Sequence, residues 1–370
     1  MSLRILVIPD KFKGSLSAAQ AARAMAIGAR KAHPGALINV MPMTDGGEGF
    51  VELLTSAAGG IIAKMRTLDP RGRVCTARYG VLKGGHYLVG LSEASGFWRV
   101  PAEARSAGKM STEGSGRILA KLIADGAKSI TVGLGGSSSN EGGIGLAAAC
   151  GYTFLDAENE KIPLNGFSLA RLYRISSPLK PYKTKFIAAS DVDNPLCGKN
   201  GASMVFGPQK GATPDELRTL DRNLRRLCRI SKRDLGHSQH DAPGAGAAGG
   251  AGYGLLNFFH AERRAGFDVF AEAVGLEELI KNHDLIITGE GALDDSSLGG
   301  KGPVSVAAMA AAMGKPIIAI CGKCGGTRVR KHFQSIGEIA SIAINLEDAM
   351  NNADRHVREL ARHHVHKHSS

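Results

Sequence analysis

The sequence predicts an α/β protein in which a Rossmann- or flavodoxin-like, doubly wound parallel-sheet domain carries a second, mixed α/β domain as an insertion. The first observation is a set of short apolar runs, rich in β-branched residues, which are typical of strands buried on both faces. The second observation is a separation of about 240 residues between the first two runs and the last three, much longer than a crossover requires. The runs occupy residues 3–8, 37–41, 284–288, 316–320 and 340–344.

Two helical segments accompany these runs. Residues 15–32 begin with a serine cap and continue with alanine-rich helical spacing, while residues 302–315 have proline near the start and glycine near the end. A strand followed by a helix is the repeating unit of a parallel sheet. We therefore expect a discontinuous outer domain at 1–47 and 283–370 and an inserted domain at 48–282.

The inserted part has a different pattern. Residues 61–92 alternate apolar and polar positions around an Asp-Pro-Arg-Gly turn and a Lys-Gly-Gly turn, which predicts an antiparallel meander. Further strands are expected at 129–134, 151–155 and 186–190. The insert is therefore predicted to contain a mixed sheet.

Composition limits the classes of function. The chain has 370 residues, of which 43% are hydrophobic, and a formal net charge of +12, so an anionic partner is reasonable. Aromatic residues make up only 5%, which argues against nucleic acid, and the basic stretch 222–234 is predicted to be a solvated helix face. The absence of a leader or a membrane-length apolar run predicts a cytoplasmic protein with no membrane partner.

The six cysteines are widely scattered, which favours free thiols over disulfides. Cys321 and Cys324 form a CxxC pair, but no second pair of metal ligands accompanies it. We therefore assign no metal site or redox role to the cysteines.

A loop rich in glycine and serine, GLGGSSSNEGGIG, spans residues 133–145 between a predicted strand and a predicted helix. Its apolar flanks argue against a linker, and the absence of GxxxxGK[ST] from the chain excludes a P-loop. We expect its backbone N–H groups, with the start of the helix, to hold an anion; a purely structural turn is the alternative. The candidate residues are Gly135, Gly136, Ser137, Ser138 and Asn140.

A second glycine pattern, GAGAAG at 244–249, matches the GxGxxG template of dinucleotide-binding proteins. It does not follow a strand, so the context that the template requires is missing. We interpret it as a helix start that packs closely on a neighbour or approaches a ligand.

Four clusters combine acidic residues with glycine at the ends of predicted strands, where ligands gather in open parallel sheets. They are residues 8–15, 43–49, 189–198 and 288–302. Lysine can offset phosphate charge, and carboxylates can bind Mg²⁺ or accept a hydroxyl proton, so the combination indicates phosphoryl transfer. The lysines are Lys11, Lys13 and Lys301, and the acids are Asp45, Glu48, Asp191, Asp193 and Asp294.

At these clusters the sequence resembles the bacterial glycerate kinase family of glucarate and glyoxylate metabolism. The resemblance covers nearly the whole chain and is carried by IPDKFKGSLSA, PMTDGGEG, GLGGSSSNEGG, TGEGALDDSSLGGKGP and the block SDVDNPLCGKNGASMVFGPQKGAT. It implies two α/β domains and transfer of the ATP γ-phosphoryl group to D-glycerate with Mg²⁺. The expected product is 2-phosphoglycerate, although other relatives make the 3-phosphate.

We expect the following roles for such a kinase. Asp191 orients or deprotonates the acceptor hydroxyl, Lys13 and Lys301 hold triphosphate or substrate carboxylate, and Asp45 and Asp294 bind Mg²⁺, with Lys13 and Asp294 also counted as catalytic. Gly289 and Glu290 join Lys301 and the loop residues 135–140 as candidates for binding the nucleotide. The candidates for substrate binding are Asp10, Lys11, Asp45, Gly46, Gly47, Glu48 and Asn194.

Several positions depart from the family pattern. Lys11 replaces a serine, and Ser138, Ser139 and Glu141 replace alanine, threonine and aspartate. Ala292 and Ser296 stand where arginine and glutamine are common, so a cation is lost unless Lys11 replaces it.

These departures leave alternatives open: a 3-phosphate product, a related hydroxy acid, or a ligand-binding member without turnover. A nucleic-acid-associated protein is supported by net charge alone. The resemblance also leaves a homodimer open.

Overall fold

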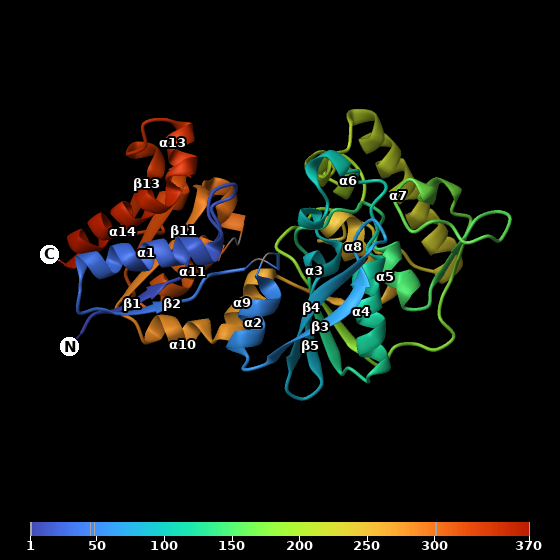
Figure 1. Cartoon of the computed structure of the whole chain (residues 1–370), viewed down its shortest axis with the longest axis horizontal. Helices are drawn as coiled ribbons and strands as arrows, with labels where there is room; N and C mark the ends of the chain where they lie inside the picture. The colour runs from blue at the N-terminus through green and yellow to red at the C-terminus, as the bar shows by residue number, and fades with distance from the viewer. Residues whose placement is uncertain (1, 45, 48, 300–301, 370) are drawn as a thin grey trace. The chain divides into compact units, whose positions relative to one another are not determined.

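The computed structural model describes residues 2–44, 46–47, 49–299 and 302–369. The chain forms two compact units, the first made of residues 1–44 and 270–370 and the second of 45–269 (Figure 1). The return to the first unit falls within α9 (Gly266–Val274) rather than at residue 283, because α10 (Leu276–Lys281) packs against α11 of the first unit. None of the described helices is both long enough and apolar enough to span a membrane.

The first unit contains a sheet of five parallel strands. Numbered by their order along the chain within this sheet, the strands have the spatial order 2-1-3-4-5, which is the flavodoxin-like arrangement and confirms the predicted fold class. Their spatial sequence is β2 (Leu37–Val40), β1 (Arg4–Val7), β11 (Leu285–Leu293), β12 (Ile317–Cys324) and β13 (Ser335–Glu338).

The last strand was misplaced by the apolar pattern. The strand predicted at 340–344 is wrong, since β12 pairs with Ser335–Glu338 instead. The chain then enters a short 3₁₀ turn at Ile339–Ser341, and Ile342 and Ile344 are 41% and 87% exposed. An exposed apolar turn thus carries the same residue pattern as a buried strand.

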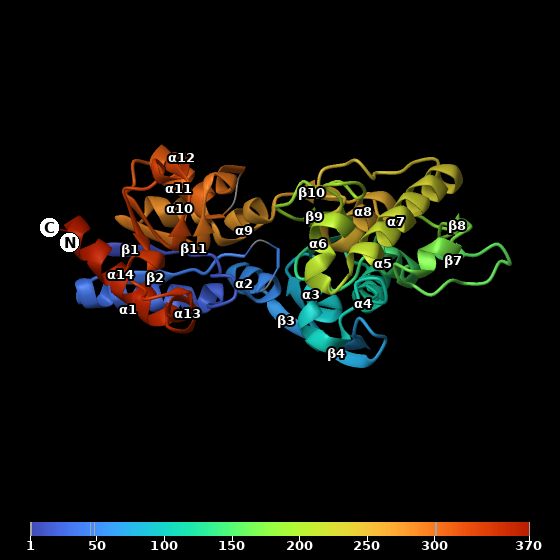
Figure 2. The ribbon, with the colours of Figure 1, turned by 90° about the horizontal axis from the view of Figure 1, so that it is seen from above.

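Helices cover both faces of this sheet, with α1 and α14 on one side and α10 and α11 on the other (Figure 2). Ser17 caps α1 by accepting a bond from the Gln20 backbone, while the Gln20 side chain accepts one from the Ser17 backbone. The helices not yet given are α1 (Ala18–Ala32), α11 (Gly302–Ala312), α12 (Thr327–Arg330), α13 (Leu346–Asn351) and α14 (Ala353–Ser369).

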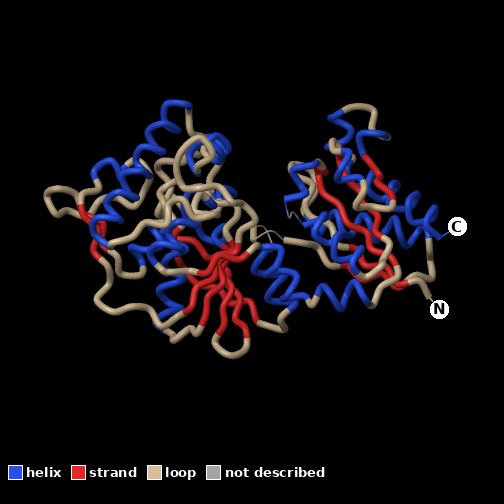
Figure 3. Tube along the Cα trace, turned by 180° about the vertical axis from the view of Figure 1, so that it is seen from behind, coloured by secondary structure: helices blue, strands red, loops and turns tan. Residues whose placement is uncertain are grey.

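The second unit contains a six-stranded mixed sheet, as expected for the insert (Figure 3). The predicted meander is confirmed as three antiparallel strands, and the remaining strands continue from β5 in parallel. The spatial sequence is β3 (Ile61–Leu68), β4 (Val74–Leu82), β5 (His86–Gly90), β6 (Ser129–Gly133), β9 (Lys185–Ala189) and β10 (Glu262–Arg264).

The predicted strand at 151–155 forms, but outside that sheet. It is β7 (Thr153–Leu155), which pairs antiparallel with β8 (Arg174–Ser176) in a separate hairpin. One hydrophobic core joins the large sheet to six helices. These helices are α3 (Leu91–Ser95), α4 (Glu113–Ala124), α5 (Ile144–Ala149), α6 (Ala202–Phe206), α7 (Pro214–Leu235) and α8 (Ala247–Phe258). A further helix, α2 (Phe50–Ala57), contacts β3, β4 and β5.

Helices α1 and α14 pack tightly at Gly28, and this contact yields a stability prediction. A Cβ at Gly28 would lie 2.3 Å from the Arg358 carbonyl oxygen. We expect Gly28→Ala to lower the free energy of unfolding by about 1–3 kcal/mol, because overpacking outweighs the better helix propensity of alanine. Urea unfolding measures this change. Gly35→Ala, where an added methyl group meets nothing within 4 Å, is the control; equal losses in both variants would contradict the packing argument.

Candidate active site

The centre of the parallel sheet brings two of the predicted clusters together. The strand order reverses between β1 and β11, and ligands of such sheets bind outside the carboxyl ends of the strands at this point. The Asp10 N–H donates to the Gly289 carbonyl at 2.8 Å, and a Cβ on Gly291 would lie 3.1 Å from the Lys13 nitrogen. The chain therefore places the 8–15 cluster beside the 288–302 cluster.

Polar side chains at this point are ordered by local hydrogen bonds. Asp10 accepts a bond from the Lys11 backbone at 2.6 Å; both residues are half-buried, whereas Lys13 is exposed. Ser297 donates its hydroxyl proton to Glu290 at 3.1 Å, and its backbone N–H donates to the Asp294 carbonyl at 2.9 Å. Ser297 is a buried residue that the sequence interpretation did not select, although it lies within the DDSS motif.

Gly289, a predicted nucleotide-binding residue, has an evident packing role. A Cβ at this position would lie 1.9 Å from the Ile320 carbonyl oxygen, so only glycine permits the approach of β12. Ala292, the first departure from the family pattern, is exposed at the same end of β11. The side chain of Ser296 and residues Asp45, Glu48 and Lys301 lie outside the described residues.

No group of three His, Cys, Asp or Glu side chains within the described residues is arranged to hold a metal ion. The cysteines, including Cys321 and Cys324, are free thiols. Burial raises the pKa of the Cys321 thiol.

In the second unit, three clusters meet at the carboxyl ends of β6 and β9. The Leu134 N–H donates to the Ala189 carbonyl at 2.9 Å. A Cβ on Gly46 would lie 2.9 Å from that same carbonyl oxygen, and one on Gly135 would lie 2.4 Å from the Gly47 Cα. These distances require glycine and bring the TDGGEG segment against the glycine-serine loop.

Only the first part of the glycine-serine loop faces outward. Gly136 is exposed and Gly135 half-buried, whereas residues 137–141 are buried. The Ser138 N–H donates to the Ser95 carbonyl at 3.0 Å, as does the Ser138 hydroxyl at 3.1 Å. Among the described residues, no acceptor takes the N–H groups of Gly135 or Gly136, so these two donors can meet an external anion, whereas Ser137 is buried.

A lysine fixes the loop from its buried side. Lys210 is 4% exposed, and its Nζ donates to the Ser137 hydroxyl at 2.8 Å and to the Ser139 carbonyl at 2.7 Å. Burial lowers the pKa of Lys210 to about 7, and the charge of Glu141 partly opposes that shift. The sequence interpretation did not select Lys210, although it stands in the FGPQKGA block that carries the family resemblance.

Glu141 occupies the start of helix α5. Its carboxylate accepts bonds from the Thr112 hydroxyl at 2.6 Å and the Gly145 N–H at 3.1 Å. The expectation that the start of this helix holds an external anion is therefore corrected, because the chain supplies its own carboxylate there. Burial raises the pKa of Glu141 to about 7, while these hydrogen bonds and Lys210 act in the opposite direction.

The GAGAAG segment supports the same loop. The Gly142 N–H donates to the Gly249 carbonyl at 3.1 Å, and a Cβ on Gly249 would lie 1.9 Å from the Ser139 carbonyl oxygen. This confirms close packing on a neighbour. Asn140 is also turned inward, since its Nδ2 donates to the Ser203 hydroxyl at 2.8 Å.

Asp191 and Asn194 follow β9 at the same edge of the sheet as the loop. Asp191 is half-buried and accepts a bond from the Phe267 N–H at 3.2 Å. Asn194 donates from Nδ2 to the Asn200 carbonyl at 2.8 Å, so it shapes its own loop. Of the two, Asp191 has the chemistry of a base.

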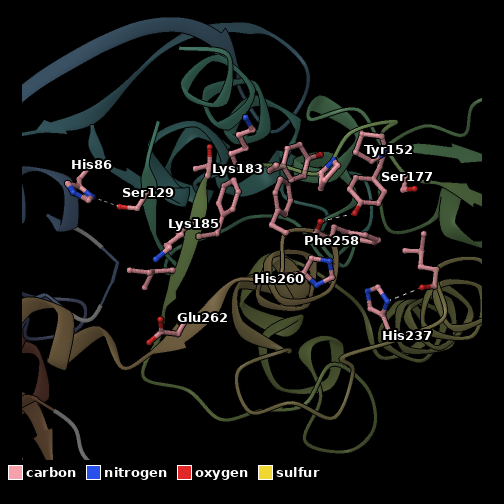
Figure 4. A pocket seen from close by; sticks show the side chains of 18 of the residues that line it. His86, Ser129, Tyr152, Ser177, Lys183, Lys185, His237, Phe258, His260 and Glu262 are labelled. Atoms are coloured by element: carbon pink, nitrogen blue, oxygen red, sulfur yellow. Dashed lines mark hydrogen bonds between the residues drawn. The ribbon is translucent and has the colours of Figure 1, made fainter. Parts of the chain in front are cut away.

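The opposite edge of this sheet carries a hollow of about 1100 Å³ (Figure 4). It is lined by residues from the amino ends of the strands, among them His86, Ser129, Lys185 and Glu262. None of the predicted site residues lines it, and ligands of parallel sheets gather at the carboxyl ends. We therefore do not assign the reaction to this hollow.

Comparisons with known proteins identify the family of the chain. The model of the glycerate kinase family matches residues 5–368. Glycerate kinase of Bacillus subtilis (strain 168) is 37% identical, covering 97% of this chain and 96% of the relative. Glycerate 2-kinase of Escherichia coli (strain K12) is also 37% identical, covering 93% of this chain and 91% of the relative.

A solved structure gives the same result. A crystal structure of a candidate glycerate kinase 2 from Salmonella typhimurium LT2 has a TM-score of 0.78 and 35% identity, covering 100% of this chain and 98% of that one. Fold and relatives together define the protein as a kinase of α/β architecture. The chain belongs to the glycerate kinase family.

The buried carboxyl group of Glu141 predicts a pH dependence of stability. Its pKa is raised from 4.5 to about 7 on folding, so the folded protein binds an additional proton between these values and loses stability as pH rises. Relative to Glu141→Gln, the free energy of unfolding of the wild type should fall by about 3 kcal/mol across this window. Urea unfolding at several pH values measures the difference. Glu103→Gln, at an exposed glutamate, should follow the wild type; parallel curves for wild type and Glu141→Gln would refute the assignment.

Proposed function

We propose that this kinase transfers the γ-phosphoryl group of ATP to the 2-hydroxyl of D-glycerate with Mg²⁺, giving 2-phosphoglycerate. The observation that carries the proposal is the pairing of the Asp10–Lys13 loop with the Glu290–Asp294 segment where the strand order of the flavodoxin-like sheet reverses. The name of the Escherichia coli relative, glycerate 2-kinase, supports the position of transfer.

The residues present fit Mg²⁺ bound together with a nucleotide. Mg²⁺ in phosphoryl-transfer sites is commonly held by one or two carboxylates plus substrate phosphates, so an all-protein cage is not required. Glu290 and Asp294, tied to Ser297, offer such oxygens, and Asp45 is a further candidate. When bound, the ion would neutralise charge on the β- and γ-phosphates.

The chain itself supplies cations and backbone donors. Lys11 and Lys13 offset the charge of the anionic reactants, and Lys11 compensates for the cation absent at Ala292. The N–H groups of Gly135 and Gly136 hold either the phosphates or the glycerate carboxylate, with Lys210 keeping the loop in shape. Asp191 accepts the proton of the attacking hydroxyl.

A coupled assay of ADP release tests the proposal. ADP should form from Mg-ATP only when D-glycerate is present, and ³¹P NMR should identify the product as 2-phosphoglycerate. A 3-phosphate product, or faster turnover of a related hydroxy acid, would replace the stated reaction with that alternative. Binding of glycerate without ADP release would instead identify a family member that binds ligand without turnover.

Asp191→Asn tests the base. The asparagine keeps the oxygen that accepts the Phe267 N–H but cannot take a proton at neutral pH. We expect kcat to fall by about 10²- to 10⁴-fold, with KM for both substrates changed little. Steady-state kinetics measure both constants.

Asp193→Asn is the matched control. Asp193 lies two residues after Asp191 in the same loop, is exposed and forms an ion pair with Arg263. The control should retain near-normal kcat. Equal kcat values for both variants and the wild type would remove Asp191 from the role of base.

A further inference from the structure

Helix α7 carries four arginines around a surface hollow of about 570 Å³. The hollow is lined by Arg222, Arg225, Arg226 and Arg229, together with Ala170 and Asn223. The arginines are spaced i, i+3, i+4 and i+7, so they lie on one face of the helix. We call these four arginines with their hollow the arginine groove.

The groove has an excess of positive charge. Arg225 donates to Asp221 at 2.8 Å, whereas Arg226 donates from Nε to the Leu172 carbonyl at 2.7 Å. In the part of the chain that the structure describes, Arg222, Arg226 and Arg229 form no ion pair with a carboxylate. Like charges at these spacings destabilise a helix, so a bound anion would relieve repulsion that the protein itself leaves uncompensated.

The groove is built on a rigid support. A capping box of Thr213 and Glu216 fixes the start of α7, and Leu220 and Leu224 are fully buried on its inner face. Asn223 donates to the Gly166 carbonyl at 2.9 Å, which holds the helix against the segment that forms the second wall. The arginine side chains therefore start from fixed backbone positions, which reduces the entropy lost on binding.

We infer that the arginine groove binds a small multivalent phosphate, at a site that the proposed reaction does not use. Guanidinium groups present planar pairs of N–H donors that match phosphate oxygens, and several of them around one hollow favour several phosphates on one ligand. The volume lies within the range of small-molecule sites. No aromatic ring lines the hollow, so the stacking used to hold single-stranded nucleic acid is absent there.

Isothermal titration calorimetry with sodium tripolyphosphate, without Mg²⁺ and at constant ionic strength, tests this inference. The groove variant is Arg222→Gln/Arg229→Gln, and the control is Arg218→Gln/Lys232→Gln on the same helix. The control removes the same charge from residues that do not line the hollow. Glutamine has a helix propensity close to that of arginine and lysine, so both variants should keep α7.

The wild type and the control should bind tripolyphosphate with the same Kd. In the groove variant this Kd should be at least about tenfold higher. Equal Kd values in all three proteins, or equal weakening in both variants, would overturn the inference, because net charge or another site would then explain the binding. A third outcome would also overturn the inference: tripolyphosphate binds none of the three proteins, whereas an oligouridine binds the wild type but not the groove variant. That result would identify a nucleic-acid surface.

Discussion

The parallel pairing of β1 with β11 is the constraint on which the rest of the structure depends. It joins residues 280 positions apart, as in the hydrogen bond from the Thr288 hydroxyl to the Ile8 carbonyl. Without it, β1 and β2 would have no connection to the other three strands of their sheet. The same pairing creates the reversal of strand order and sets the Asp10–Lys13 loop beside Glu290. The β1–β11 pairing therefore determines both the strand order of the first unit and the position of its candidate site residues.

In the second unit, the corresponding constraint is the burial of small polar residues in the glycine-serine loop, residues 133–145. Burying such groups is unfavourable unless each finds a partner, and satisfied polar networks specify one conformation. Lys210 and Glu141 provide buried hydrogen-bonding partners, while the glycines of α8 allow its backbone to approach the loop. The outward N–H groups of Gly135 and Gly136 are thus presented by a loop whose other half is buried.

Much of the fold could be predicted from sequence, because strands buried on both faces leave continuous apolar runs. The failure at 340–344 has a clear cause: pairing with β12 decides which segment is a strand, and residue type alone does not report pairing. The acid and glycine clusters were recognisable because ligands gather at strand ends. Lys210 and Ser297 were not, since the burial of one polar side chain beneath a distant loop depends on tertiary contacts that no local pattern records.

The insertion has a consequence for how the protein is made. During synthesis, all of residues 45–269 leave the ribosome before β11 exists, so the first two strands must wait for a distant partner. The second unit holds its whole sheet within one continuous stretch of chain and can complete it during that interval. Until β11 arrives, the apolar strand β1 lacks its final neighbour on that side, and this is the period in which a nascent chain is exposed to aggregation and chaperones. The central strand pair that organises the finished kinase is therefore among the last contacts the chain can form.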